Sequence, residues 1–326
     1  MNRNRVSILV IMPFYFEYEK IIKRALENRK FNVYLINEDF DQVSFLNHAA
    51  FLYCPYLKDY IIRSYYTKQI EKIDSKIDTV LIINGRTLTD SLIQELKKVF
   101  YDSRFIMYQW DSVEKAPHAL MISKYCDKNL TFDRRDAEKF HWMYRPLFFD
   151  VEDCAPSKKM YDISFICSLH SQRIAVLDAV EKYASDKRIT LFSYMYAERW
   201  SFIRQKYIKK NPLAQIENSR IKFKKLDLSK TNAIYDRSLC VLDYKFPEQN
   251  GLTMRSIESI GHKCKLITNN INIYDEEFYD PRNVYVYDLN SFDIPMDFIL
   301  SPYKDIKQDA YYRYTIDGWI DDVLSE

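Results

Sequence analysis

The run LCVLDYKFPEQNGLTMRSIESIGHKCKLIT, residues 239–268, decides the fold. It begins with a strand-like run, 239–243, that is apolar up to Leu242, and passes through a polar loop that contains Gly251. Helical spacing follows over 253–260, and a second strand-like run, 265–268, comes after it. A strand, a helix and a strand in this order predict a parallel β-α-β unit. The N-terminus of such a helix presents unpaired N–H groups and the positive end of the helix dipole, which suit a diphosphate.

The same alternation of buried strands and amphipathic helices extends over most of the chain, which predicts α/β architecture with parallel sheets covered on both faces. The expected strands are 6–12, 31–36, 79–83, 105–108, 128–132, 163–166, 189–192, 221–223, 239–243, 265–268 and 284–287. The expected helices are 18–28, 60–70, 89–99, 173–184, 200–207, 231–237, 253–260 and 311–324.

A stretch without periodicity interrupts this alternation at 151–160 and predicts a linker. We therefore expect two doubly wound domains, residues 1–150 and 161–305, which would enclose a cleft. The remaining segment, 306–326, contains the amphipathic helix with Trp319 and is expected to pack back across the domain junction.

Composition and charge exclude several classes of protein. Hydrophobic residues make up 47% of the chain and charged residues 29%, as in globular proteins with a core. The net charge is +2, with 23 basic and 20 acidic residues up to position 150 and 25 and 26 after it, so nucleic acid is not an expected partner. No stretch approaches the about 18 apolar residues of a membrane span, and we expect a cytoplasmic protein or one at the inner surface of the membrane. The six scattered cysteines include no C-x-x-C pair, so neither a disulfide framework nor a metal site is expected.

Two charged residues of the predicted helix 253–260 suit a nucleotide. Arg255 lies near its start and could pair with phosphate, and Glu258, one turn further, could accept both hydroxyls of a ribose. The alternative is a plain connection between strands with a solvated Arg–Glu pair. Spacing alone leaves both interpretations open.

This segment resembles the donor-binding motif of GT-B glycosyltransferases, in which Glu-Gly-x-Gly-Leu-x-x-x-Glu precedes a helix of small residues and a glycine. It is most similar to bacterial capsular and lipopolysaccharide biosynthesis proteins related to the CgeB-like glycosyltransferases. The resemblance implies that Glu258 is the ribose-binding acid and that Gly251, Leu252 and Thr253 form the backbone cradle, although the Gly-Leu pair lies two residues further from the acid than usual. Asn250 stands where that pattern has a second Glu, so a retaining mechanism cannot be carried over from the resemblance, and the stereochemical course stays open.

The segment 161–173 carries a second signal. In the resembling family, the first strand of the donor domain ends in a loop followed by an Arg that opens a helix, and Ser168, His170 and Arg173 match this position. Arg173 would then face the diphosphate, and His170 would bind phosphate or sugar. The alternative is a surface histidine beside an arginine that opens a helix.

The first half of the chain offers candidates for the acceptor side, where the family carries similar Trp-Asp-Ser segments. Trp110 could stack on an acceptor sugar, and Asp111 could be the general base that removes a hydroxyl proton, unless Asp111 caps the following helix. Glu17, in the loop after the first strand, is a rival base or an exposed acid favoured by the helix dipole.

Four further polar residues of the first half are expected to have structural or solvated roles. Asp133 and Asp136 belong to a Phe-Asp-x-x-Asp segment that the family shares, but we interpret them as ordering a turn. His118 and His141 are interpreted as structural or solvated.

The resemblance therefore implies a GT-B fold, with two Rossmann-like domains facing a cleft and a C-terminal helix that packs back across the junction. It implies transfer of a sugar from a nucleotide-diphosphate sugar to a glycan or lipid-linked glycan of a bacterial capsule or lipopolysaccharide. No metal or other cofactor is expected, because Arg173 and Arg255 would neutralise the leaving diphosphate. The inner membrane and other polysaccharide-assembly enzymes are further expected contacts. Two alternatives stay open, a nucleotide-sugar epimerase on the same fold and a non-catalytic binding subunit of a polysaccharide assembly complex.

Overall fold

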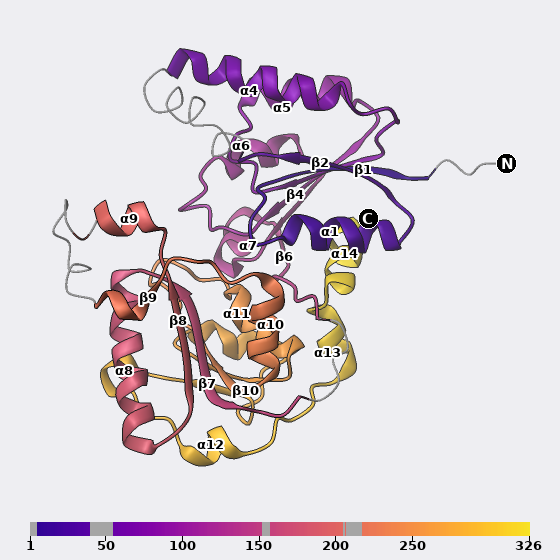
Figure 1. Ribbon diagram of the computed structural model, residues 1–326. Helices are drawn as coiled ribbons and strands as arrows, with labels where there is room; N and C mark the ends of the chain where they lie inside the picture. The colour runs from indigo at the N-terminus through magenta and orange to yellow at the C-terminus, as the bar shows by residue number, and fades with distance from the viewer. Residues whose placement is uncertain (1–4, 40–54, 152–156, 205, 207–216) are drawn as a thin grey trace. The chain divides into compact units, whose positions relative to one another are not determined.

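The computed structural model describes residues 5–39, 55–151, 157–204, 206 and 217–326 (Figure 1). The chain forms two compact units. The first unit comprises Met1–Leu147 together with Ile316–Glu326, and the second comprises Phe148–Thr315. The chain thus returns to its first unit for the last segment.

The first unit is built on a six-stranded parallel sheet in the order β2-β1-β3-β4-β5-β6. Every residue of β1 is buried, as expected for a strand covered on both faces. Helices α4 and α5 cover one face, and α1 and α14 the other (Figure 1). The strands are β1 Ser7–Met12, β2 Asn32–Asn37, β3 Thr79–Ile83, β4 Arg104–Gln109, β5 Lys128–Thr131 and β6 Met143–Tyr144. The helices are α1 Tyr18–Asn28, α4 Pro55–Ile70, α5 Asp90–Val99, α6 Ala119–Ile122, α7 Arg134–Phe140 and α14 Ile316–Leu324.

The second unit has a parallel sheet in the order β12-β11-β10-β7-β8-β9. The chain starts at β7, moves to β8 and β9, and then returns to place β10 on the other side of β7. Helices α8 and α12 pack on one face and α10 and α11 on the other. The strands are β7 Tyr161–Ser168, β8 Leu191–Tyr196, β9 Ile221–Lys222, β10 Ser238–Leu242, β11 Lys265–Thr268 and β12 Val284–Val286. The helices are α8 Ser171–Lys187, α9 Arg199–Ile203, α10 Leu228–Asp236, α11 Met254–Gly261, α12 Met296–Leu300 and α13 Gln308–Arg313.

The predicted α/β class with two Rossmann-like sheets is confirmed. The prediction of one helix over 311–324 is wrong, because α13 ends at Arg313 and α14 begins at Ile316. The carbonyl of Tyr314 accepts from the N–H of Phe149 at 2.8 Å, so the backbone leaves the helical ladder between α13 and α14. The segment 306–326 is accordingly divided between the two units.

Other predicted elements differ in extent. The helix expected at 200–207 is the shorter α9, and Tyr207 lies outside the described residues. Of the expected linker 151–160, residues 152–156 lie outside them as well. Strand β6 and helices α6, α7 and α12 were not expected, because each is too short to show a clear period. None of the helices in the described ranges has the length and hydropathy needed to cross a membrane.

Candidate functional site

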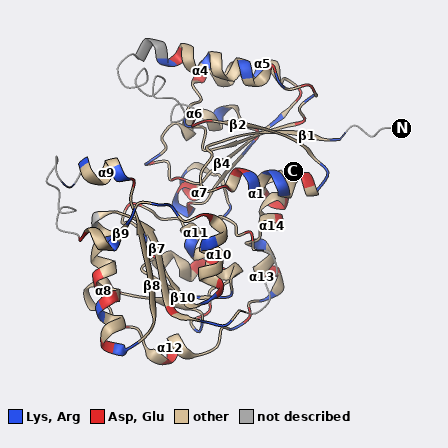
Figure 2. Ribbon diagram, in the orientation of Figure 1, with Lys and Arg blue, Asp and Glu red and all other residues tan. Residues whose placement is uncertain are grey.

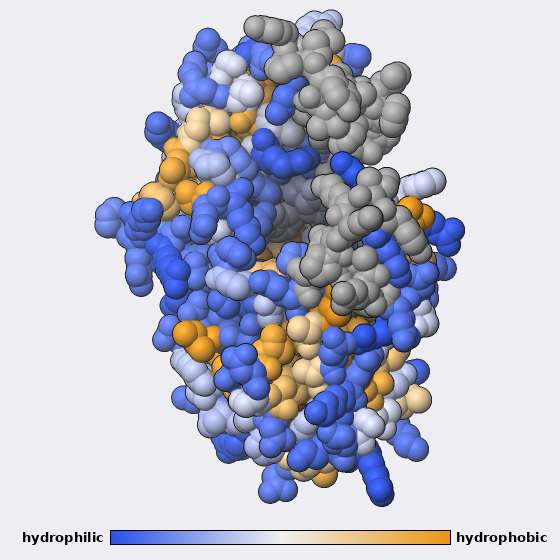
Figure 3. Space-filling model, turned by 90° about the vertical axis from the view of Figure 1, so that its left-hand side faces the viewer, coloured by the Kyte–Doolittle hydropathy of each residue, from blue (hydrophilic) through white to orange (hydrophobic). Residues whose placement is uncertain are grey.

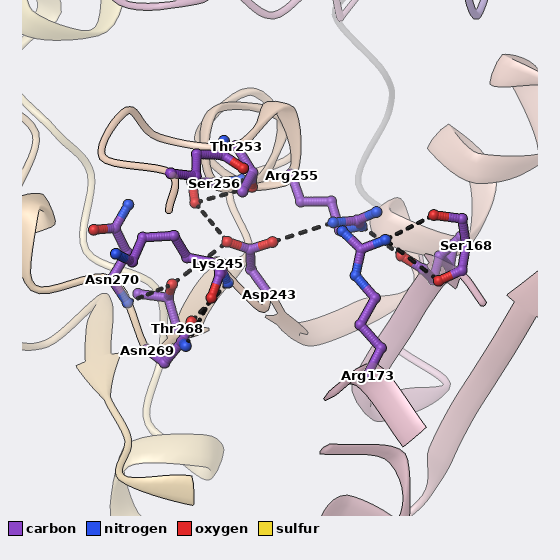
Figure 4. A network of polar contacts seen from close by, with 12 residues as sticks. Ser168, Arg173, Asp243, Lys245, Thr253, Arg255, Ser256, Thr268, Asn269 and Asn270 are labelled. Atoms are coloured by element: carbon purple, nitrogen blue, oxygen red, sulfur yellow. Dashed lines mark hydrogen bonds and ion pairs between the residues drawn. The ribbon is translucent and has the colours of Figure 1, made fainter. Parts of the chain in front are cut away.

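The sheet of the second unit reverses its strand order between β7 and β10. Doubly wound sheets bind their ligands at such a switch point, outside the carboxyl ends of the strands. Ser168, His170 and Arg173 follow β7, and the predicted residues from Asn250 to Glu258 follow β10. The structure therefore brings the two predicted donor segments to one place (Figure 4).

The helix expected after the glycine loop is α11, and its first turn is capped by Thr253. The Thr253 hydroxyl accepts from the N–H of Ser256 at 3.2 Å, which satisfies one of the first unpaired donors. Leu252, Ile257 and Ile260 are buried and fix the loop and the helix against the unit's interior. The remaining N–H groups of the first turn are positioned at the switch point.

The loop before α11 is held by two asparagines that the sequence analysis missed. The carbonyl of Asn250 accepts from Nδ2 of Asn272 at 2.6 Å, and that of Gly251 accepts from Nδ2 of Asn270 at 3.3 Å. Asn270 is fully buried, so this support is part of the core. The signal in the sequence was a cluster of asparagines directly after a strand, a composition that favours side chain to backbone bonds.

Arg255 is anchored by a buried carboxylate, Asp243, at the end of β10. Its Nη1 lies 3.2 Å from Oδ1 of Asp243, and its Nε donates to the carbonyl of Ile166. The other oxygen of Asp243 accepts from the hydroxyls of Ser256 at 3.1 Å and Thr268 at 3.4 Å. Burial lowers the pKa of Arg255, but Asp243 and further negative groups raise it above its ordinary value. The solvated Arg–Glu pair considered from the sequence is therefore not the arrangement found.

Arg173 is the second arginine at this point, and it has a different set of partners. Its Nη1 donates to the hydroxyl of Ser168 at 2.7 Å, and its guanidinium lies 4.6 Å from the ring centroid of Phe246. Arg173 is 8% exposed, its Nε makes no hydrogen bond, and it forms no salt bridge with a described carboxylate. Burial and then the like charge of Arg255 lower its pKa to about 10, so it stays protonated at neutral pH. A buried cation without an ion-pair partner favours an anionic ligand.

Two further predicted donor residues lie around these arginines. The exposed ring of His170 packs edge-on against Phe246, with the centroids 4.6 Å apart. Glu258 is half-buried one turn after Arg255 on α11, and its negative charge acts on Arg255. Phe246, which contacts both His170 and Arg173, was not singled out from the sequence.

The acceptor-side candidates of the first unit centre on Asn84, at the end of β3. Its Nδ2 donates to Asp111 at 3.3 Å, and Nε2 of His118 lies 3.2 Å from both Asn84 oxygens. Nε2 of Gln109 donates to the Asn84 carbonyl at 2.7 Å. Burial raises the pKa of Asp111 and lowers that of His118. Asp111 does not cap α6, and His118 lies in the candidate cluster.

Trp110 is half-buried directly before Asp111. Glu17 is separate, because it precedes α1 with φ 66° and pairs with Lys20. The structural interpretation holds for Asp133, which caps α7 by accepting from the N–H of Arg135 at 2.9 Å. Asp136 accepts from the N–H of Val113 at 2.7 Å, also a structural contact.

A buried acidic pair after β2 escaped the sequence analysis. Glu38 is fully buried, and burial, with the negative charge of Asp39, raises its pKa to about 8. Asp39 forms an ion pair with Arg86. In the sequence the pair is visible as two acids directly after an apolar run. Over the described residues, no group of His, Cys, Asp and Glu side chains has a metal-binding arrangement.

No family model and no curated protein matches the sequence. Among solved structures, Anabaena Alr3699/HepE in complex with UDP and glucose shares 12% identity over 98% of this chain and 100% of that one, with a TM-score of 0.56. The fold is GT-B. HepE in complex with UDP-glucose gives 13% identity over 98% and 100% of the two chains, with a TM-score of 0.55. A UDP-N-acetylglucosamine 2-epimerase gives 9% identity over 98% of this chain and 95% of that one, with a TM-score of 0.49.

Proposed function

We propose that this GT-B chain is a glycosyltransferase that moves a sugar from a nucleotide-diphosphate sugar to a glycan or lipid-linked glycan of a bacterial capsule or lipopolysaccharide. The observation that carries the proposal is Arg173, a buried, protonated arginine that lies at the switch point without a carboxylate partner. The UDP-glucose in one HepE structure supports a nucleotide-diphosphate sugar as the donor class.

In this proposal the diphosphate lies between Arg173 and the first turn of α11. The anion would pair with Arg173 and relieve the repulsion between Arg173 and Arg255, while free N–H groups of α11 donate to its oxygens. Glu258 would bind the ribose hydroxyls, and His170 would bind phosphate or sugar. The loop from Asn250 to Thr253 would form the backbone cradle, since Asn270 and Asn272 hold it in place.

The transfer reaction requires two contributions from side chains, stabilisation of the leaving group and removal of a proton from the acceptor. The acceptor oxygen forms a bond to the anomeric carbon as the bond from that carbon to the diphosphate breaks. Arg173 and Arg255 stabilise the negative charge that develops on the leaving diphosphate. The acceptor hydroxyl must also lose its proton to a base. Asp111 is favoured over Glu17, because burial raises the pKa of Asp111, whereas Glu17 already pairs with Lys20. Trp110, next to Asp111, would stack on the acceptor sugar.

Binding of UDP and UDP-glucose to the full chain tests the donor site. A ligand at about 100 times its dissociation constant should add about 2.7 kcal/mol to the unfolding free energy, which a thermal-shift assay detects. Arg173→Ala should weaken UDP binding about tenfold to hundredfold, because a charge-assisted hydrogen bond is lost. Arg188→Ala is the matched control, since Arg188 is an exposed arginine at the other end of α8.

Assays of sugar transfer distinguish a glycosyltransferase from a protein that only binds the donor. Asp111→Asn should keep UDP binding and lose sugar transfer to glycan acceptors. Equal UDP affinity of Arg173→Ala and the parent protein would show that the donor site is elsewhere. Conversion of the donor sugar without any added acceptor would favour the epimerase, and donor binding without turnover on any acceptor would favour the binding subunit.

A further inference from the structure

One segment of the second unit is far more basic than the chain as a whole. Residues 195–230 contain ten Lys and Arg and three Asp and Glu, a net charge of +7. The whole chain carries +2, so the remaining residues together carry −5. The segment includes α9 and β9, and a division of the sequence at residue 150 hides its charge.

Five exposed residues on and beside α9 and β9 are taken together as the α9–β9 patch: Arg199, Trp200, Arg204, Lys222 and Lys224. Trp200 is 75% exposed, and the four basic residues are exposed as well. The two elements are in contact, because the Arg199 guanidinium lies 5.3 Å from the Phe223 ring centroid. Figure 2 shows the blue basic residues on both sides of α9, and Figure 3 views the side of the molecule on which α9 lies.

The internal contacts of the second unit do not account for this patch. Arg220, in the same segment, forms salt bridges with Asp178 and Glu181 and is therefore not part of it. Within the described ranges, no salt bridge joins a basic residue of the patch to a carboxylate. Lysine on an edge strand such as β9 prevents pairing with other strands, which explains Lys222. Edge protection does not explain an exposed tryptophan between two arginines on a separate helix.

We infer that the α9–β9 patch binds the surface of a membrane that contains anionic phospholipids. Lys and Arg side chains are attracted to the negative surface of such a membrane, and tryptophan inserts its ring at the level of the headgroups. The patch has both features, while Phe202, next to Trp200, is buried in the core and holds α9 in place. The patch shares no residue with the proposed donor site, because α9 and β9 follow β8, whereas the donor residues follow β7 and β10.

Nucleic acid is the competing anionic partner, and the patch fits it less well. Single strands bind along a row of aromatic side chains on which successive bases stack. Among the aromatic residues of this segment that the structure describes, only Trp200 is exposed, since Phe202 is buried and Phe223 half-buried. One exposed indole suffices for a membrane interface but provides a single stacking platform.

Co-sedimentation of the full-length protein with vesicles tests the inference. We expect binding to vesicles of phosphatidylcholine with phosphatidylglycerol, and much weaker binding to phosphatidylcholine alone. Lys222→Gln with Lys224→Gln should lower the partition coefficient about thirtyfold, at about 1 kcal/mol for each basic residue near an anionic surface. Lys98→Gln with Lys124→Gln removes the same charge from exposed positions of the first unit and should leave binding nearly unchanged.

Tryptophan fluorescence tests the insertion of Trp200. The emission of the parent protein should shift to shorter wavelength on the mixed vesicles, and Trp200→Phe should abolish this shift while UDP binding is kept. Equal losses from the two lysine pairs would overturn the inference, because binding would then follow net charge and not the patch. Retention on a single-stranded nucleic acid without vesicle binding would overturn it as well.

Discussion

Arg173 and Arg255 carry the same charge at the same switch point, but their partners give them different roles. Arg255 is tied to Asp243 and to the carbonyl of Ile166, so it contributes to the fold as well as to the proposed donor site. Arg173 is positioned by neutral oxygens of Ser168 and keeps an uncompensated charge. A variant of Arg173 is therefore the cleaner test of ligand binding, since removal of Arg255 would leave the buried Asp243 carboxylate without its cation.

Glu38 should make the stability of the protein depend on pH between pH 4.5 and about pH 8. Its pKa is raised from 4.5 to about 8 by burial and by Asp39, so the folded state holds this proton at pH values where the unfolded state has lost it. Stability should therefore fall as pH rises from its ordinary pKa through about 8. The slope for one proton is about 1.4 kcal/mol per pH unit. Glu38→Gln should remove this part of the slope in denaturant unfolding at several pH values.

Glu138→Gln is the control for this prediction, because Glu138 is an exposed acid on α7. The comparison concerns the slope with pH and not the absolute stability, since a buried amide at position 38 has its own cost. If Glu38→Gln and the parent protein show parallel stability profiles between about pH 5 and pH 8, Glu38 does not retain its proton in the folded protein.

At the scale of elements, the sequence predicts the strands well because their burial produces long apolar runs. All the expected strands are present, and the errors concern boundaries and short elements such as β6. The break between α13 and α14 was not predictable from local pattern, since it depends on a hydrogen bond from Phe149, far away in the sequence. Period and propensity do not encode such a long-range contact.

The residues of the candidate site also fall into those that the sequence predicts and those that only the structure shows. Arg173 and Arg255 could be found because each lies near the start of a helix that follows a strand. Their partners Asp243 and Phe246 could not be identified, because the sequence does not show that the ends of β7 and β10 are neighbours. The role of Asn84 was hidden for the same reason, since it joins Asp111 and His118 only after β3 and β4 have paired.

Helix α12 should depend on a lysine that lies on a strand. Lys265 of β11 is buried, and its Nζ donates to the carbonyls of Phe298, Ile299 and Ser301 at the C-terminus of α12. Lys265→Met should cost about 2 to 4 kcal/mol of unfolding free energy, because these carbonyls lose a charged donor. Denaturant unfolding measures the loss.

Lys263→Met provides the comparison two residues earlier in the chain. Lys263 pairs with Asp305 at the surface, where an ion pair contributes at most about 1 kcal/mol. Equal stabilities of the two variants would mean that the Lys265 contacts are replaced by water without loss.

At the scale of the whole molecule, the chain ends in the same unit in which it begins. Helix α14 packs on α1 and β4 of the first unit, and Trp319 packs edge-on against Tyr108 at a centroid distance of 4.9 Å. Basic residues from the first unit hold the C-terminus as well, with Arg104 and Lys128 donating to carbonyls of the last residues. The first unit therefore includes a helix that is synthesised only after the second unit is complete.

The packing of α14 in the first unit should depend most on Arg145. It is fully buried and forms an ion pair at 2.8 Å with Asp322, whose side chain is 40% exposed. Asp322→Ala leaves a buried guanidinium without its carboxylate and should cost about 1 to 3 kcal/mol, less than for a fully buried pair because water reaches Asp322. Amide hydrogen exchange should become faster in α14 and β4 and stay unchanged in β7 and β10 of the second unit.

The neighbouring variant Asp321→Ala separates this effect from the loss of any acid on α14. Asp321 pairs with Arg29, whose side chain is 26% exposed, so its removal should cost at most about 1 kcal/mol. Both variants remove one negative charge from the same helical turn, but Arg145 loses its carboxylate in the interior, whereas the partly exposed Arg29 keeps a second carboxylate, Asp317. If exchange in β4 also becomes faster in Asp321→Ala, the total negative charge of α14 holds this helix against the first unit. If the effect is confined to Asp322→Ala, the ion pair of the buried Arg145 holds it.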